Sequence, residues 1–194
     1  MNRSMSCFSL TSVDFASLSG AIVWSQISVY FSILVPQLES AAQAASVIQK
    51  AKYAPIGMRG MAVPRASTWG FDENYTQREN DETLILVQCE NMSCYEHLEE
   101  VGQVEGLDAI FLGPYDMSQA LGIPGQIKAP QMLEVEKKIL EVCKKNGKFA
   151  GIFVNTIDDA LAAREAGWQF ILMGMDIATI GYAYKHDVDI FNKK

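Results

Sequence analysis

The sequence contains few histidines and no paired cysteines, and both shortages limit the chemistry it can carry. Its 194 residues include two histidines, His97 and His186. The four cysteines form no C-x-x-C pair, and their spacing matches no zinc-binding pattern. We therefore expect no zinc site and interpret the cysteines as free thiols in a reducing compartment, which favours a cytoplasmic location.

Basic residues and long apolar runs are scarce as well. A formal net charge of −7 argues against a nucleic-acid partner, because phosphate binding requires a basic face. Residues 20–36 are the only candidate membrane stretch, but serine and glutamine interrupt it well before the ~18 apolar residues that a spanning helix needs. We predict no membrane partner. The alternation over residues 27–33 instead predicts a strand, and the first 19 residues lack a clear signal-peptide cleavage motif.

From residue 32 onward, short apolar runs alternate with helical periodicity. Apolar runs occur at 32–36, 84–90, 108–113, 148–155 and 169–176. Helical patterns fall between them, and a terminal helix is expected over 177–191. Runs that are apolar on both sides of the chain are typical of parallel strands covered on both faces. Repeated strand–helix units of this kind predict a single-domain α/β fold.

Several local signals place the ends of the expected helices. Ser93 and Glu96 have the spacing of a capping box. Thr156 is expected to cap the helix that follows it, with Asp159 in its first turn and Gly167 at its end. Residues 53–83 interrupt the alternation with a long, irregular stretch rich in glycine and proline. Loops of this length are more often functional than not.

Two carboxylates, Glu90 and Asp116, follow the apolar runs at 84–90 and 108–113. They are 26 residues apart, which is one strand–helix repeat, so their strands are expected to be neighbours about 4.8 Å apart. Ligands of parallel α/β folds meet the carboxyl ends of the strands. Two carboxylates this close repel each other unless a positive charge lies between them, and Mg²⁺ or Mn²⁺ suits that position.

A purely structural interpretation of the same residues carries about equal weight. Asp and Glu are common at helix starts, so both carboxylates could serve as helix caps. The presence of Gln88, two residues before Glu90, slightly favours a binding site over helix capping. Asp176 is a third carboxylate after a strand, with the same ambiguity. His97 and His186 are best interpreted as exposed.

Five segments taken together resemble the HpcH/HpaI family of metal-dependent class II pyruvate aldolases, of the 4-hydroxy-2-oxoheptanedioate and 2-dehydro-3-deoxyglucarate aldolase type. They fall in the family's order, over about four fifths of the chain. The segments are ILVPQLESAAQAASVIQKAKYAPIGMRG (33–60), RASTWG (65–70), LVQCEN (86–91), VEGLDAIFLGPYDMSQALG (104–122) and GMD (174–176).

The resemblance implies a (β/α)₈ TIM barrel of the phosphoenolpyruvate/pyruvate type, here incomplete with about five to six strands. Residues 1–31 form a segment unlike the family, and residues 32–194 form the partial barrel. The resemblance assigns Glu90 and Asp116 as metal ligands for Mg²⁺ or Mn²⁺, with Co²⁺ as a further candidate. It assigns substrate contacts to Gln88, to the backbone amides of Tyr115 and Asp116, and to the apolar side chains of Met61 and Phe153.

The implied activity is retro-aldol cleavage of 4-hydroxy-2-oxo acids to pyruvate and an aldehyde, through a metal-stabilised pyruvate enolate. The family's catalytic histidine and arginine fall in barrel strands that precede residue 32 in the family, so no catalytic residue is assigned here. We accordingly expect an N-terminally truncated, impaired aldolase that forms homo-oligomers. The alternative is a non-catalytic remnant that binds metal and pyruvate or oxalate.

Overall fold

The computed structural model describes residues 32–63 and 65–193, and its central element is a parallel sheet of five strands. The strands pair in sequence order, β1-β2-β3-β4-β5, so each adds beside the one before it. They are β1 (Ser32–Val35), β2 (Leu84–Cys89), β3 (Ala109–Leu112), β4 (Phe149–Val154) and β5 (Phe170–Met173). All five expected apolar runs thus form strands. The part of the strand expected over 27–33 that precedes residue 32 lies outside the described residues.

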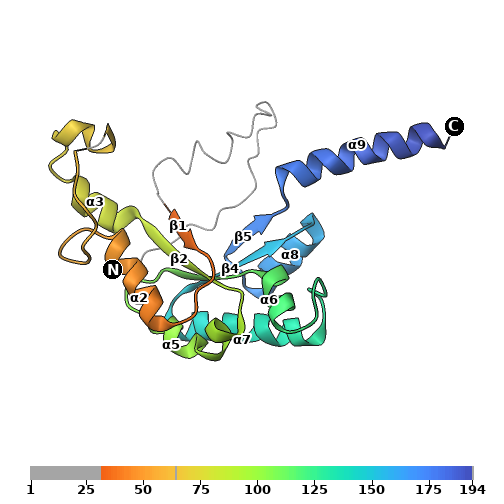
Figure 1. The fold of residues 1–194 in the computed structure, drawn as a ribbon, viewed down its shortest axis with the longest axis horizontal. Helices are drawn as coiled ribbons and strands as arrows, with labels where there is room; N and C mark the ends of the chain where they lie inside the picture. Colours follow the sequence, from red (N-terminus) through yellow and green to blue (C-terminus); the bar gives the residue numbers. More distant parts are fainter. Residues whose placement is uncertain (1–31, 64, 194) are drawn as a thin grey trace.

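Helices connect the strands in a repeating strand–helix order. They are α2 (Ala41–Ala51), the 3₁₀ helix η1 (Arg65–Gly70), α3 (Tyr75–Glu82), α4 (Met92–Glu96), α5 (Leu98–Gly102), α6 (Pro114–Ala120), α7 (Pro130–Asn146), α8 (Ile157–Ala166) and α9 (Asp176–Asn192). The sheet curls, with α5 and α7 packed along its outer side (Figure 1). The described part of the chain is therefore an incomplete, TIM-barrel-like α/β fold, as the sequence predicts.

The main core lies between the outer face of the sheet and these helices. Successive strand residues point to opposite faces, so Ile85, Val87 and Cys89 of β2 all face this core. Helix α7 contributes a stripe at helical spacing, including Met132 and Ile139, both fully buried. Burying each such side chain stabilises the fold by about 1.5–3 kcal/mol. This core fixes the positions of β2 and β3, whose carboxyl ends lead to the candidate carboxylates.

Two local expectations were wrong, for different physical reasons. The cap of α4 is Asn91 and not Ser93, because the Asn91 side chain accepts from the Cys94 backbone N–H at 2.9 Å and donates to the Leu38 carbonyl at 3.0 Å. The stretch 53–83 is not irregular throughout, since it contains η1 and α3. The sequence of α3 is almost wholly polar and so shows no apolar period. The Thr156 cap, with Asp159 in the first turn, is confirmed.

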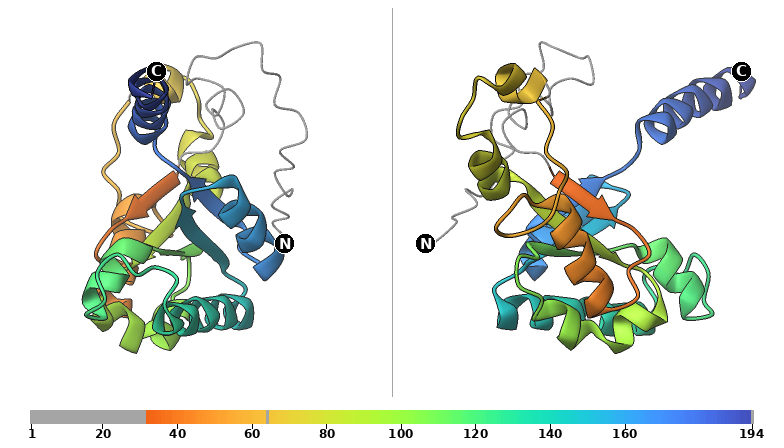
Figure 2. Two further views of the ribbon diagram at one scale, coloured as in Figure 1. Left: turned by 90° about the vertical axis from the view of Figure 1, so that its right-hand side faces the viewer. Right: turned by 60° about the vertical axis from the view of Figure 1, so that its left-hand side comes forward.

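Helix α9 stands away from the body of the molecule in Figure 1 and in the right-hand view of Figure 2, and it contains no buried residue. Five of its apolar residues share one face of the helix, and each is more than half exposed. They are Ile177, Ile180, Tyr184, Val188 and Phe191. Within residues 32–63 and 65–193, no helix is long and apolar enough to cross a membrane.

Candidate metal and 2-oxo acid site

The pairing of β2 with β3 brings the two predicted carboxylates to one edge of the sheet. In that register Cys89 lies opposite Leu112, so Glu90, directly after β2, follows at the level of Gly113. Asp116 is the third residue of α6, which starts at Pro114 directly after Gly113. Both side chains therefore emerge at the carboxyl ends of neighbouring parallel strands, as the 26-residue spacing predicts.

Glu90 is held in place by a residue that the sequence pattern did not single out. Its side chain is buried, with 3% of the residue exposed. The Gln37 backbone N–H donates to Glu90 Oε1 at 2.8 Å, and the Gln37 side-chain amide donates to the same oxygen at 3.1 Å. Gln37 has a φ of 53°, a left-handed conformation that turns the chain after β1 toward Glu90. The segment PQLES at 36–40 was visible in the sequence, but nothing local indicates this contact across 53 residues.

The electrostatic environment of Glu90 is that of a buried anion beside another anion. Burial raises the pKa of the Glu90 carboxyl above its ordinary value, and the neighbouring Asp116 carboxylate raises that pKa further. The hydrogen bonds from Gln37 oppose this shift by lowering the pKa of Glu90. A pair of carboxylates whose repulsion is only partly offset by neutral donors suits a bound cation.

Gly113 leaves the space in which Glu90 and Gln88 sit side by side. A Cβ atom at this position would lie 2.7 Å from Gln88 Nε2 and 2.9 Å from Glu90 Cβ, and closer still to Glu90 Oε2. Such distances are well inside van der Waals contact, so a larger residue would displace both side chains. The Gly-Pro step after β3 therefore has two roles: Gly113 admits the polar side chains, and Pro114 starts α6.

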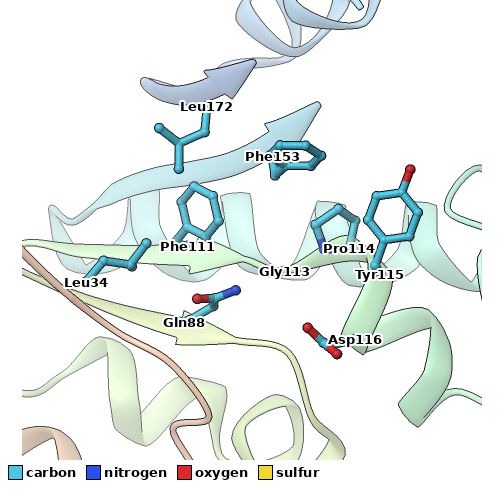
Figure 3. A pocket seen from close by; sticks show the side chains of 9 residues that line it. All are labelled: Leu34, Gln88, Phe111, Gly113, Pro114, Tyr115, Asp116, Phe153 and Leu172. Carbon is cyan, nitrogen blue, oxygen red and sulfur yellow. The ribbon is translucent and has the colours of Figure 1, made fainter. Parts of the chain in front are cut away.

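A cavity of about 230 Å³ opens beside Gln88 and Asp116 at the carboxyl ends of the strands (Figure 3). Its lining includes four of the predicted site residues, Gln88, Tyr115, Asp116 and Phe153. Tyr115 and Asp116 lie in the first turn of α6, where backbone N–H groups have no acceptor within the helix. The other lining residues are Leu34, Phe111, Gly113, Pro114 and Leu172.

The structure does not bring Met61 to this cavity. Met61 is 77% exposed and lines a separate, smaller hollow formed by residues 61–76. His97 lies between α4 and α5, with its Nδ1 2.8 Å from the Ser93 carbonyl oxygen. His186 lies on the exposed helix α9. Neither histidine lines the cavity, as the sequence predicts for both.

The residues present fit a divalent cation held by two carboxylates. Within the described part of the chain, no three His, Cys, Asp or Glu side chains gather in a metal-binding cluster. Mg²⁺ nevertheless binds through one or two carboxylates and keeps its other positions for water and substrate oxygens. Glu90 and Asp116 supply such a pair, next to an open cavity.

The fold is that of an incomplete TIM barrel, and the paired carboxylates lie at the carboxyl ends of its strands. The chain belongs to the HpcH/HpaI aldolase/citrate lyase family, whose sequence profile matches residues 25–181. That match starts within the segment 1–31 that we expected to be unlike the family. The predicted boundary between residues 1–31 and the partial barrel at 32–194 stays a prediction.

Individual relatives agree with this family. The chain is 36% identical, over 149 residues, to 2-keto-3-deoxy-L-rhamnonate aldolase of Klebsiella pneumoniae, in an alignment that covers 75% of this chain and 55% of that enzyme. A solved HpcH/HpaI aldolase from Desulfitobacterium hafniense superposes with a TM-score of 0.77 at 27% identity, covering 84% of this chain and 64% of that one.

A more distant likeness extends to the fold alone. The CitE protein of Mycobacterium tuberculosis, solved in complex with magnesium and acetoacetate, superposes with a TM-score of 0.51 at 14% identity. That superposition covers 82% of this chain and 59% of the other. The chain spans about half the length of the curated relatives it matches, since the alignment with the Klebsiella enzyme covers 55% of that enzyme.

Proposed function

We propose that this chain carries the metal and pyruvate half-site of a class II aldolase that cleaves 4-hydroxy-2-oxo acids to pyruvate and an aldehyde. The observation that carries the proposal is the meeting of Glu90 and Asp116 beside the cavity at the strand ends. Membership in the aldolase family and the resemblance of LVQCEN and LGPYDMS to its motifs support the same assignment.

Glu90 and Asp116 would hold the cation, with Mg²⁺, Mn²⁺ or Co²⁺ as candidates. When bound, it would supply Lewis-acid polarisation of the carbonyl oxygen of the 2-oxo acid. The chain's own residues would bind and orient the substrate. The Gln88 amide can donate to a substrate oxygen, and the first-turn backbone N–H groups of Tyr115 and Asp116 can donate to the substrate carboxylate.

A second candidate function is metal-dependent binding of pyruvate or oxalate without turnover. Among the described residues that line the cavity, no histidine, lysine or arginine is present to move a proton or stabilise an oxyanion. The two candidates differ in one measurement. Release of pyruvate from a 4-hydroxy-2-oxo acid, with Mn²⁺ present, supports the aldolase, whereas saturable pyruvate binding without any release supports the binding protein.

The shared carboxylate site is tested by calorimetric titration of Mn²⁺ into the wild type and the variants Glu90→Ala and Asp116→Ala. Each variant is expected to lose at least ~10-fold in affinity, since each removes one of two protein ligands. Asp176→Ala is the matched control, because Asp176 also follows a strand but is exposed and lies outside the cavity lining. Unchanged affinity in either site variant would overturn the shared site.

The remaining partner assignments follow from the same proposal. A small 2-oxo acid is the expected substrate, and the acidic net charge of −7 argues against nucleic acid. Cys89, Cys94 and Cys143 are buried free thiols, which supports the proposed cytoplasmic location. Homo-oligomerisation is expected from the open edges of the described sheet and from the exposed helix α9.

A further inference from the structure

The ring of Tyr115 is fixed in place at the mouth of the cavity. Tyr115 is 47% exposed, yet its ring has two specific partners. Its hydroxyl oxygen accepts a hydrogen bond from Asn155 Nδ2 at 2.8 Å. The ring also lies against the Phe153 ring, with centroids 6.3 Å apart and planes tilted by 57°. Phe153 lies near the end of β4 and Asn155 directly follows that strand, so one strand end supplies both contacts to the ring.

The wall of the cavity away from the carboxylates is apolar. Gln88 and Asp116 lie on one side of the opening, and Phe111, Phe153 and Leu172 lie across from them (Figure 3). Leu34 and Pro114 are further apolar residues of the lining. None of the described lining residues carries a positive charge that could pair with an anionic group on a ligand.

We propose that this apolar wall is the subsite for the carbon chain of the 2-oxo acid beyond its carbonyl. The wall selects an apolar chain over a carboxylated one. Asn155 is the positioning residue that holds Tyr115 as part of the wall. The inference rests on the proposed function, which places the 2-oxo acid head group at Glu90 and Asp116. It adds the chemical class of the remaining part of the substrate.

The selectivity follows from the cost and gain of burial. Each methylene buried against apolar side chains contributes about 0.8 kcal/mol, which corresponds to a ~4-fold gain in affinity. A terminal carboxylate placed on the same wall loses hydration and finds no cation in return. A subsite of this composition therefore favours an aliphatic chain and disfavours a dicarboxylate of the same length.

The Asn155 hydrogen bond gives the wall its shape. A half-exposed tyrosine that lacks a partner for its hydroxyl can occupy more than one rotamer, and each alternative opens the wall to water. Removing the donor from Asn155 or the acceptor from Tyr115 breaks the same bond. Asn155→Ala and Tyr115→Phe should therefore have equal effects, and the double variant should lose no more than either single variant.

The experiment compares three probes by titration calorimetry in the presence of Mn²⁺: pyruvate, 2-oxopentanoate and 2-oxoglutarate. The last two have the same number of carbons and differ in the end of the chain. We expect 2-oxopentanoate to bind about 15-fold more tightly than pyruvate, the gain from about two buried methylenes, and 2-oxoglutarate to bind no more tightly than pyruvate. In Asn155→Ala, the advantage of 2-oxopentanoate should fall about 3-fold, with pyruvate affinity unchanged. Tyr115→Phe should lower the same advantage by a similar factor.

Asn146→Ala is the matched control, because the Asn146 side chain makes a 2.9 Å hydrogen bond to the Val142 carbonyl at the far end of α7. This variant should leave all three affinities unchanged. Equal binding of the two five-carbon acids would overturn the subsite, and additive effects of Asn155→Ala and Tyr115→Phe would overturn the positioning role. If pyruvate itself fails to bind with Mn²⁺, the proposed function is wrong and the subsite is lost with it.

Discussion

Gln37 donates two hydrogen bonds to a single oxygen of Glu90, one from its backbone N–H at 2.8 Å and one from its side-chain amide at 3.1 Å. The two residues are 53 positions apart and follow neighbouring strands, β1 and β2. These bonds occupy Oε1 of Glu90 and fix the direction in which the rest of the carboxylate points. Gln37 therefore orients a proposed metal ligand without lining the cavity.

Removing the Gln37 side chain should weaken metal binding without removing a ligand. In Gln37→Ala the side-chain donor is lost and only the backbone N–H still holds Glu90 Oε1, so we expect a ~10-fold loss of Mn²⁺ affinity by calorimetry. Gln43→Ala is the control, since the Gln43 side chain accepts from the Glu39 backbone N–H and does not contact Glu90. Equal Mn²⁺ affinity in both variants would show that Gln37 does not orient the ligand.

Adding one carbon at Gly113 should damage the site and the fold together. The new Cβ would push Glu90 and Gln88 out of their positions, so Gly113→Ala should abolish Mn²⁺ binding and lower the free energy of unfolding by about 1–3 kcal/mol. Urea unfolding and calorimetry measure the two effects. Gly60→Ala is the control, because a Cβ there meets nothing within 4 Å. A Gly113→Ala protein that binds Mn²⁺ normally would contradict the packing described here.

Glu136 on α7 should make stability depend on pH in a defined direction. Burial raises the pKa of its carboxyl above the ordinary value of 4.5. A raised pKa in the folded state contributes stability below the unfolded pKa, and that contribution is lost as pH rises through the folded pKa. Glu136→Gln should therefore raise the free energy of unfolding at pH 7, by on the order of 1 kcal/mol or less, and the gain should vanish below about pH 4.

Urea unfolding of Glu136→Gln at pH 4 and at pH 7 measures this difference. Glu134→Gln is the matched control, since Glu134 lies on the same helix with its side chain exposed. A stability gain of the same size at both pH values would mean that the effect of Glu136→Gln does not come from burying its charge.

The chain is expected to associate with copies of itself. Strands β1 and β5 are the outer strands of the described sheet, and unpaired strand edges are templates for pairing. The exposed apolar face of α9 adds a second surface of this kind. Light scattering at micromolar concentration should show an oligomer, and a monodisperse monomer would contradict the prediction.

A paired substitution tests whether α9 takes part in this association. Ile180→Asp combined with Val188→Asp places two charges on the apolar face and should reduce the average mass. Tyr182→Asp is the control, because Tyr182 is 74% exposed but points away from that face by its position along the helix. An equal loss of mass in both proteins would rule out the apolar face as the contact.

The sequence by itself determined the parallel α/β fold and the carboxylate pair. Five apolar runs separated by helical periods predict β1 to β5, because buried parallel strands are apolar on both faces. The 26-residue repeat predicts that Glu90 and Asp116 meet, because consecutive strands of such a sheet are neighbours and share a carboxyl edge. These features depend on local chemistry and on a regular repeat, both of which can be seen in the chain.

Only the tertiary structure decided what surrounds that pair. The Gln37–Glu90 bonds and the Asn155–Tyr115 bond join residues 53 and 40 positions apart, and no local pattern encodes such contacts. Helix α3 could not be predicted from an apolar period, because polar contacts hold it in place. The Asn80 side chain, for example, accepts from the Tyr53 backbone N–H and donates to the Tyr53 carbonyl. The family resemblance assigns Met61 to the substrate pocket, but its side chain lines a separate hollow. The path of the chain between α2 and α3 depends on tertiary packing, which the sequence pattern does not show.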